Sequence, residues 1–350
     1  MGISQVTAPL SRLLPPLVLG GAGFSHQIIK NPNASQARKV LERAFQLGLR
    51  AIDTSAYYHP SEILLGEALS HPEISSHYSR DQYLLMTKAG RISVNHFDYS
   101  PAWIRKSVLR SLERLRTEYL DVVFCHDVEF VPESEVVEAV GVLIDLVHEG
   151  HVRYIGISGY RIDILSRLAH HVREKYDRPL DIIQNWAQLT LQNDVLARDG
   201  LAFFRSAGIS CVCSSSPLAI GLLRDEGVPV GDLARGESLA ALALRYAIRR
   251  AQLESSDSFR VTTIMGITSV AELEENLAVA RQVLPDSNEP NLLWATGPAG
   301  REKLDSEQSK QDEKLAREIQ DILGPWKNYS FPSPGDGWDV TRKQPAGTKL

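Results

Sequence analysis

Short runs of apolar and β-branched residues alternate along the chain with longer segments whose apolar residues recur at helical spacing. Glycine, proline or polar residues bound each short run, a pattern typical of buried strands. We predict eight strands: Leu17–Gly20, Arg50–Asp53, Tyr83–Thr87, Asp121–Cys125, Arg153–Ile157, Asp181–Gln184, Ser210–Cys213 and Val261–Met265. Most are spaced by about 25 to 40 residues, the length of one strand–helix unit.

The longer segments have the period of amphipathic helices. In the first of them, the apolar residues Val40, Leu41 and Phe45 share one face, and Ser35 is the expected N-cap. The predicted helices are Gln36–Leu47, Ala102–Leu115, Glu133–His148, Ile164–Tyr176, Asp194–Ser206, Ser238–Arg250 and Val270–Leu284. We expect their apolar faces to pack on the strands.

Eight strands that alternate with helices most simply close into a (β/α)8 barrel of the TIM type, in the α/β class. The main alternative, an open doubly wound sheet, usually has the sequence G-x-G-x-x-G after its first strand. Here that turn is Gly20-Gly21-Ala22-Gly23-Phe24-Ser25, which fails the spacing. The sequence therefore favours the barrel.

The barrel is predicted over residues 14–325 and includes a charged amphipathic C-terminal helix at Arg301–Leu323. An N-terminal extension over residues 1–13 precedes it. Residues 326–350 are expected to be mostly disordered, since the segment from Ser333 is polar and rich in proline and glycine.

Two regions do not fit a strand–helix unit. The segment Leu218–Gly236 is long and contains several glycines and Pro229, so we expect a loop over the barrel mouth. The segment Pro285–Gly300 is rich in proline, asparagine and glycine and is expected to be irregular.

Composition excludes several classes of protein. The 350 residues include 38 Lys and Arg and 43 Asp and Glu, which gives a net charge of -5. Nucleic-acid-binding domains are typically basic, so this charge argues against that class. No apolar stretch approaches the roughly 20 residues of a membrane helix. Three cysteines and no signal peptide fit a reducing, cytoplasmic setting, although Thr348-Lys349-Leu350 loosely resembles a peroxisomal signal. We expect no metal site, and either a monomer or a dimer.

Polar residues stand where the predicted strands end, which is where barrel enzymes place their catalytic groups. Asp53 ends the second strand, with Tyr57 and Tyr58 in the following turn, and Lys88 and His126 follow the next two strands. A nearby ammonium lowers the pKa of a tyrosine, and a carboxylate keeps a buried lysine protonated. A histidine can orient a carbonyl oxygen. The set predicts acid–base chemistry on a hydroxyl proton next to hydride transfer.

These segments resemble the aldo-keto reductase family. Ala51-Ile52-Asp53-Thr54-Ser55-Ala56-Tyr57-Tyr58 resembles its signature, Leu85–Lys88 its lysine strand and Asp121–His126 its histidine strand. The resemblance extends in order over residues 14–280 and implies a (β/α)8 reductase that uses a nicotinamide cofactor without a Rossmann domain. It implies that Tyr58 is the general acid/base, that Lys88 and Asp53 tune it, and that His126 orients the substrate carbonyl.

The resemblance also implies a cofactor site, whose expected contacts are Gly21, Ala22, Asp53, Ser158, Gln184, Ser215, Ser216, Pro217, Leu218, Gly266, Thr268, Glu272 and Asn276. Gly159 stands where most members have asparagine, and Ser215 where they have a stacking tyrosine. NADP-preferring members place Arg or Lys near the 2′-phosphate, whereas this segment offers Thr268 and Glu272. Since a carboxylate repels that phosphate and accepts from a ribose 2′-hydroxyl, we expect NAD rather than NADP.

Within the family, Cys125–Phe130, Gly156–Tyr160 and Ser330–Pro334 look most like the branch of fungal D-arabinose 1-dehydrogenases and plant L-galactose dehydrogenases. That branch oxidises the anomeric hydroxyl of a sugar to a lactone with NAD. The resemblance implies the same reaction here, on a small molecule held by His126 at a mouth lined by Asp127, Glu129 and Trp186.

Other functions stay open. One is reduction of another aldehyde or ketone, such as pyridoxal or a secondary metabolite. Another is a non-catalytic nicotinamide-binding regulatory subunit, as in the potassium-channel β subunits of this fold. A barrel glycosidase is disfavoured because it needs two carboxylates about 5 to 10 Å apart at the mouth, and the fourth strand ends in His126 instead.

Overall fold

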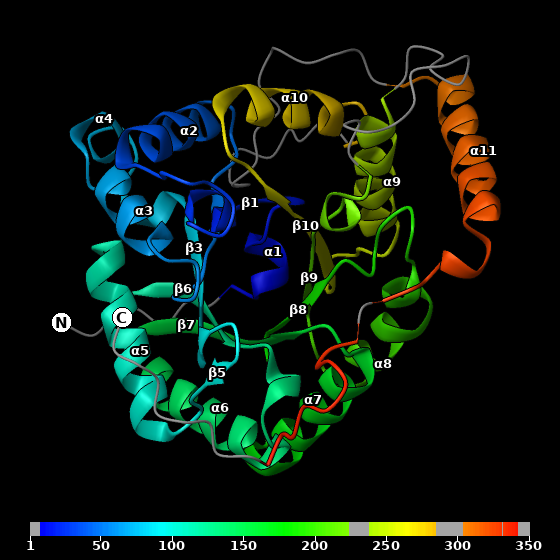
Figure 1. The fold of residues 1–350 in the computed structure, drawn as a ribbon. Helices are drawn as coiled ribbons and strands as arrows, with labels where there is room; N and C mark the ends of the chain where they lie inside the picture. The colour runs from blue at the N-terminus through cyan, green and yellow to red at the C-terminus, as the bar shows by residue number, and fades with distance from the viewer. Residues whose placement is uncertain (1–7, 224–237, 285–303, 331, 342–350) are drawn as a thin grey trace.

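A ring of parallel strands forms the centre of the protein, and helices surround it (Figure 1). The computed structural model describes residues 8–223, 238–284, 304–330 and 332–341. Its strands close in the order β1-β10-β9-β8-β7-β6-β3-β2. Their bounds are Leu17–Gly20 (β1), Ala51–Asp53 (β2), Leu84–Ala89 (β3), Leu120–His126 (β6), Val152–Gly159 (β7), Ile182–Trp186 (β8), Cys211–Ser215 (β9) and Arg260–Gly266 (β10). The predicted barrel is confirmed, with strand bounds within two residues of the prediction.

Helices follow the strands as the periodicity predicted. They are Ala34–Gln46 (α2), Pro101–Leu115 (α5), Glu133–His148 (α6), Ile162–Tyr176 (α7), Leu201–Ser206 (α8), Leu239–Leu253 (α9) and Val270–Arg281 (α10). Two details differ from the prediction. The N-cap of α2 is Asn33, whose side chain accepts from the Gln36 amide at 2.9 Å, rather than Ser35. The predicted helix Asp194–Ser206 is divided into a π-helical turn, Leu196–Gly200, and α8.

The helix Ser61–Leu69 (α3), followed by a short helix Pro72–Ser75 (α4), was not predicted. Nearly every side chain of α3 is buried, including those of Ser61 and Glu62. A helix that is buried over most of its surface has no continuous polar face, so its sequence lacks an amphipathic period. Gly66 lets it approach α5, because a Cβ there would lie 2.0 Å from the Arg114 carbonyl oxygen.

A hairpin of two very short strands, Arg91–Ser93 (β4) and His96–Phe97 (β5), follows β3. It too was not predicted, since segments of three and two residues are too short to display a period. The hairpin begins directly after Gly90, whose φ of +105° places it in the region that favours glycine. This turn brings Arg91 back over the end of the barrel that holds Lys88.

The N-terminal extension closes the other end of the barrel. The described part of it includes the helix Leu10–Leu13 (α1), and Leu10 and Leu14 pack on the barrel's interior side chains. The Tyr154 hydroxyl, near the start of β7, donates to the Ala8 carbonyl at 2.7 Å. The N-terminal ends of the strands are therefore covered, and the opposite ends are left for a site.

The predicted C-terminal helix is present and ends at Leu323 as expected, but it begins at Ser306 (α11, Ser306–Leu323), since residues 304 and 305 are not helical and residues 301–303 lie outside the described range. It packs on α9 through Arg245, which donates to both oxygens of Asp312 at 2.8 and 2.9 Å and is 1% exposed. Such a buried pair holds α11 firmly, since removing one partner costs about 3–5 kcal/mol.

The tail differs from the expectation of disorder over residues 332–341. Trp338 contacts the rings of Phe97 and Phe130, with centroid distances of 5.9 and 5.2 Å, and donates from its indole nitrogen to the Phe130 carbonyl at 3.0 Å. The composition of the tail is polar, but Trp338 and the buried Ser333, whose hydroxyl donates to Glu129 at 3.0 Å, attach it to the barrel.

Several predicted features lie outside the described residues. They are most of the Leu218–Gly236 loop, the Pro285–Gly300 segment and the three C-terminal residues. Among the described residues, no helix is long and apolar enough to cross a membrane. No group of three or more metal-ligating side chains occurs in that part of the chain.

Candidate active site

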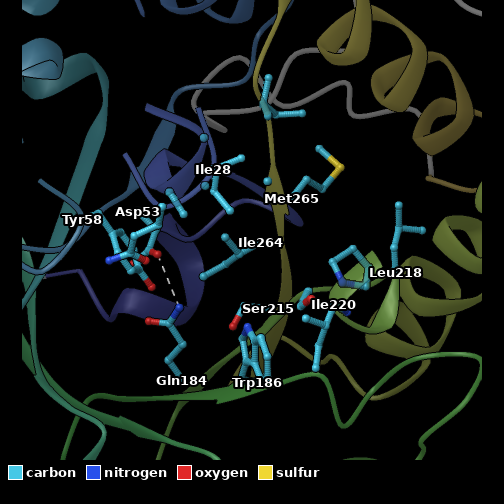
Figure 2. A pocket seen from close by; sticks show the side chains of 18 of the residues that line it. Ile28, Asp53, Tyr58, Gln184, Trp186, Ser215, Leu218, Ile220, Ile264 and Met265 are labelled. Carbon is cyan, nitrogen blue, oxygen red and sulfur yellow. Dashed lines mark hydrogen bonds between the residues drawn. The ribbon is translucent and has the colours of Figure 1, made fainter. Parts of the chain in front are cut away.

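A pocket of about 440 Å³ opens at the C-terminal ends of the strands. It is lined by Tyr58, Asp53, Lys88 and His126, so the structure brings these four together as the strand order predicted. The other predicted contacts that line it are Ala22, Asp127, Ser158, Gln184, Trp186, Ser215, Ser216, Pro217, Leu218, Gly266, Thr268, Glu272 and Asn276. Figure 2 shows Gln184 reaching towards Asp53 and Tyr58, with Trp186 close to Ser215.

Gly21, an expected cofactor contact, and Glu129, an expected residue of the mouth, do not line the pocket. Gly21 faces the Asp53 carbonyl and the Ser61 hydroxyl, whereas Ala22 and Gly23, the next residues of the same 3-10 turn, do line it. Glu129 lies behind the wall, where its Oε1 accepts from the Tyr160 amide at 2.7 Å and from the Ser333 hydroxyl at 3.0 Å. Burial and the nearby charge of Asp127 raise the pKa of Glu129 to about 8.

Lys88 and Asp53 form a buried ion pair across β3 and β2. The Lys88 ammonium donates to both carboxylate oxygens of Asp53, at 2.8 and 2.7 Å, and to the Thr54 carbonyl at 2.8 Å. The side chains are 2% and 5% exposed. Burial raises the pKa of Asp53, while hydrogen bonds and charge from Lys88 oppose that rise. These three acceptors satisfy the hydrogen-bonding groups of the buried Lys88 side chain.

Tyr58 lies against this pair and departs from one expectation. Its ring centroid is 5.2 Å from the Lys88 ammonium, and no hydrogen bond joins the two side chains among the described contacts. Burial, followed by the charges of Asp53 and Asp127, raises the pKa of Tyr58 well above its ordinary value. We had expected Lys88 to lower it. Burial is the largest cause, and Asp53, which pairs with Lys88, offsets the charge of the ammonium.

His126 is neutral and held in one tautomer. Burial, together with the charges of Lys88 and Arg91, lowers its pKa well below the ordinary value. Its Nδ1 lies 3.0 Å from the hydroxyl of Ser55, which is fully buried and also accepts from the Tyr57 amide. The described residues offer that hydroxyl proton no other acceptor, so Nδ1 accepts it and the imidazole proton is on Nε2. The histidine thus presents a donor to the pocket.

The inner end of the pocket fits a nicotinamide carboxamide. Gln184 donates to Asp53 at 3.4 Å, and its Oε1 is buried without a partner among the described residues. An amide N–H of a bound ligand would satisfy that oxygen. Ser158, directly beside Gln184 in the β7–β8 register, offers a hydroxyl at the same level.

The outer end of the pocket lies between β10 and α10. Glu272 accepts from both the amide and the hydroxyl of Thr268, each at 2.7 Å, and is thereby fixed at the pocket wall. Among the described residues the only cationic side chains that line the pocket are Lys88 and Arg91, both at its other end. This end is therefore acidic.

Sequence reasoning missed Arg91 and Tyr160, which line the pocket between Tyr58 and Asp127. Arg91 was missed because the hairpin that positions it was not predicted. Its guanidinium forms an ion pair with Asp127 and lies 4.2 Å from the centroid of the Tyr57 ring. A signal for Tyr160 was present in the sequence. Side chains alternate along a strand, so Tyr160, two residues beyond Ser158, is expected on the same side as Ser158.

Acid–base groups at the mouth of a barrel, next to a carboxamide-binding end, define a barrel oxidoreductase rather than a hydrolase. The conserved pattern of the aldo/keto reductase family matches residues 16–290. The chain belongs to this family.

Two relatives are similar over most of their length. One is the D-arabinose 1-dehydrogenase of Saccharomyces cerevisiae, 37% identical over 301 residues, which are 81% of this chain and 87% of the relative. The other is the L-galactose dehydrogenase of Arabidopsis thaliana, 30% identical over 313 residues, which are 84% of this chain and 86% of the relative. The branch named from the sequence is the one that these relatives represent.

Two solved structures share the fold. A glycerol dehydrogenase from Gluconobacter oxydans is 20% identical, with a TM-score of 0.59 over 95% of this chain and 97% of its own. An aldo/keto reductase from Klebsiella pneumoniae, in complex with NADP and acetate, is 23% identical, with a TM-score of 0.59 over 87% of this chain and 92% of its own. At these identities the likeness concerns the fold alone.

Proposed function

We propose that this chain oxidises the anomeric hydroxyl of an aldose to a lactone with NAD as cofactor. The observation that supports this most is the convergence of Tyr58, His126 and the Lys88–Asp53 pair on one pocket. The names of the two relatives support the substrate class, because the similarity extends over more than four fifths of each.

In the proposed reaction the hydroxyl of the reacting carbon binds between Tyr58 and His126. His126 donates from Nε2 to the hydroxyl oxygen. Tyr58 accepts the hydroxyl proton as the hydride leaves the reacting carbon. A bound oxidised nicotinamide supplies the hydride acceptor and a positive charge that lowers the pKa of nearby acids. The Lys88 ammonium acts in the same direction as far as the paired Asp53 carboxylate leaves its charge uncompensated, because a cation within about 4–6 Å favours the phenolate form.

The proposed preference for NAD rests on the acidic outer end of the pocket. The Glu272 carboxylate is suited to accept from a ribose 2′-hydroxyl and repels a 2′-phosphate. Substituting Glu272→Lys is expected to shift the ratio of NADP to NAD efficiency upwards by about tenfold or more, as one charge-assisted contact replaces a repulsion. Glu274→Lys, on the exposed side of the same helix, is the matched control.

Reduction of a carbonyl compound is the second candidate function. The specific observation that favours it is the raised pKa of Tyr58, which keeps the phenol protonated and ready to donate. In this direction the same side chains act on an aldehyde or ketone, with Tyr58 giving up its proton to the carbonyl oxygen.

The test is reduction of nicotinamide by the purified protein over D-arabinose, L-galactose, L-fucose and L-xylose, each with NAD and with NADP. Turnover of one sugar with NAD is expected. Tyr58→Phe should lower kcat by about 100-fold or more, while NAD binding persists in a titration. Tyr119→Phe removes a hydroxyl outside the pocket and serves as control. If no sugar is turned over but carbonyl compounds are reduced, the second candidate function is established instead.

A further inference from the structure

An ion pair beside Tyr58 and His126 has no part in the proton transfer described above. Asp127 directly follows His126 at the end of β6 and has a φ of +57°, which turns its side chain to the pocket. Arg91 comes from the hairpin after β3 and lines the same pocket. One carboxylate oxygen of Asp127, Oδ2, lies 3.6 Å from His126 Nε2 and accepts from Arg91 Nη1. The pair is therefore next to the reacting position.

The Arg91 guanidinium is held rigidly by the hairpin. Its Nε donates to the Ser93 carbonyl at 3.3 Å and its Nη2 to the Val94 carbonyl at 3.1 Å. The Tyr57 ring covers one face, and the side chain is 13% exposed. A cation that is fixed in this way loses little conformational entropy when it binds a ligand.

The pair keeps unused hydrogen-bonding groups on the pocket side. Of the five N–H donors of a guanidinium, Ser93, Val94 and Asp127 take three, and Tyr160 contacts a fourth. At least one donor is left. Asp127 Oδ1 makes no hydrogen bond with any residue that the structure describes. One free donor beside one free acceptor matches a hydroxyl group, which both accepts and donates.

The charge of the surroundings favours a neutral ligand. Arg91 and Asp127 cancel each other, and Glu129, the third ionisable group of the cluster, lies behind the pocket wall with its pKa raised to about 8, so it is mostly uncharged at neutral pH. An anionic substrate would meet the Asp127 carboxylate at close range. A polyhydroxylated, uncharged substrate meets no such repulsion.

Resting on the proposed function, we propose that Arg91 and Asp127 form a subsite for the hydroxyl next to the reacting carbon, and so select polyhydroxylated substrates over simple ones. Adjacent oxygens of a sugar are close enough that one at His126 Nε2 brings its neighbour to the Asp127 carboxylate, whose Oδ2 is 3.6 Å away and whose Oδ1 is the free acceptor. Arg91 is then a specificity-determining residue, in addition to its contact with Tyr57.

The test compares D-arabinose with 2-deoxy-D-ribose, which lacks only the hydroxyl at the adjacent carbon. The wild-type kcat/KM is expected to favour D-arabinose on the order of 10- to 100-fold, as for a hydrogen bond to a charged group. Arg91→Met and Asp127→Asn should each lose most of this ratio, because both lose more on D-arabinose than on the deoxy sugar. D-Glyceraldehyde and 3-hydroxypropanal, which lacks only the hydroxyl at the adjacent carbon, form the matching pair in the direction of reduction.

The matched control is Arg80→Met. Arg80 is also paired with a buried aspartate, Asp121, and lies 4.0 Å from the Tyr119 ring centroid, but it is outside the pocket. Its loss should lower thermal stability without changing either substrate ratio. If Arg91→Met and Arg80→Met behave alike, or if the wild type turns over neither hydroxylated substrate, the subsite is refuted. If the wild type turns over no sugar but prefers the hydroxylated aldehyde over the other aldehyde, the proposed sugar oxidation is refuted and the subsite is supported.

Discussion

Removing the charge of Lys88 should destabilise the fold and abolish turnover for separable reasons. Lys88→Met keeps an unbranched side chain of similar length but leaves Asp53 buried without its counter-charge. The pair is almost fully buried, and three hydrogen bonds of 2.7 to 2.8 Å are lost. Breaking such a pair costs about 3–5 kcal/mol, which is a large part of the roughly 5–15 kcal/mol that stabilises a domain.

The size of this penalty should depend on pH. Without Lys88, burial of Asp53 is opposed only by the Gln184 hydrogen bond, so its pKa in the folded state rises further above the unfolded value. Above the unfolded pKa the native variant then holds a proton that the unfolded chain has released, so its stability falls as the pH rises. The deficit of Lys88→Met relative to the wild type is expected to be larger at about pH 8 than at about pH 5.

The assay is a double-mutant cycle by urea denaturation, followed by tryptophan fluorescence, at both pH values. Asp53→Asn combined with Lys88→Met replaces the ion pair by neutral groups, and part of the lost stability should return. The coupling between the two changes is expected in the range of about 0.5–3 kcal/mol. Turnover should stay absent in the double variant, because the charge near Tyr58 is still missing.

A loss below about 1 kcal/mol for Lys88→Met, or strictly additive changes in the cycle, would refute the reasoning. Either result would mean that water reaches Asp53 and replaces Lys88, in spite of the burial seen in the structure.

Three further outcomes are expected. Ser55→Ala removes the hydroxyl that holds the His126 tautomer, so kcat/KM should fall about tenfold and ¹⁵N NMR of the imidazole should show both tautomers; a single unchanged tautomer would contradict this. The folded pKa of Glu129, about 8, exceeds the unfolded value of 4.5, so stability should decline with rising pH between these values, and Glu129→Gln should remove that decline in thermal melts. Trp338→Ala removes a partly buried ring, so it should cost less than the roughly 3–5 kcal/mol of a core aromatic and expose the tail to limited proteolysis; unchanged cleavage would show that other contacts hold it.

Most of the barrel could be predicted from the sequence because its strands and outer helices have strong periods. Buried strands appear in the sequence as continuous apolar runs, and the outer helices appear as apolar residues at helical spacing. Both patterns depend on local sequence alone. Helix α3 was missed because most of its surface is buried, so its sequence shows no amphipathic stripe. The tail was misjudged over residues 332–341 because composition does not reveal the contacts of Trp338 with Phe97 and Phe130.

The side chains of the acid–base set could also be predicted from the sequence, because the ends of parallel strands bring Asp53, Lys88 and His126 to one end of the barrel. Their electrostatics were not. The raised pKa of Tyr58 comes first from its burial and then from the charges of Asp53 and Asp127, and all of these depend on contacts between segments far apart in the chain.

The sequence by itself determined the barrel, the end of it that holds the site and the chemical types of the groups there. Only the tertiary structure decided that Gly21 and Glu129 lie outside the pocket and that Arg91 lies inside it. The physical reason is that periodicity records the burial of single elements, whereas pairing, protonation and access to the pocket depend on side chains from elements far apart in the chain.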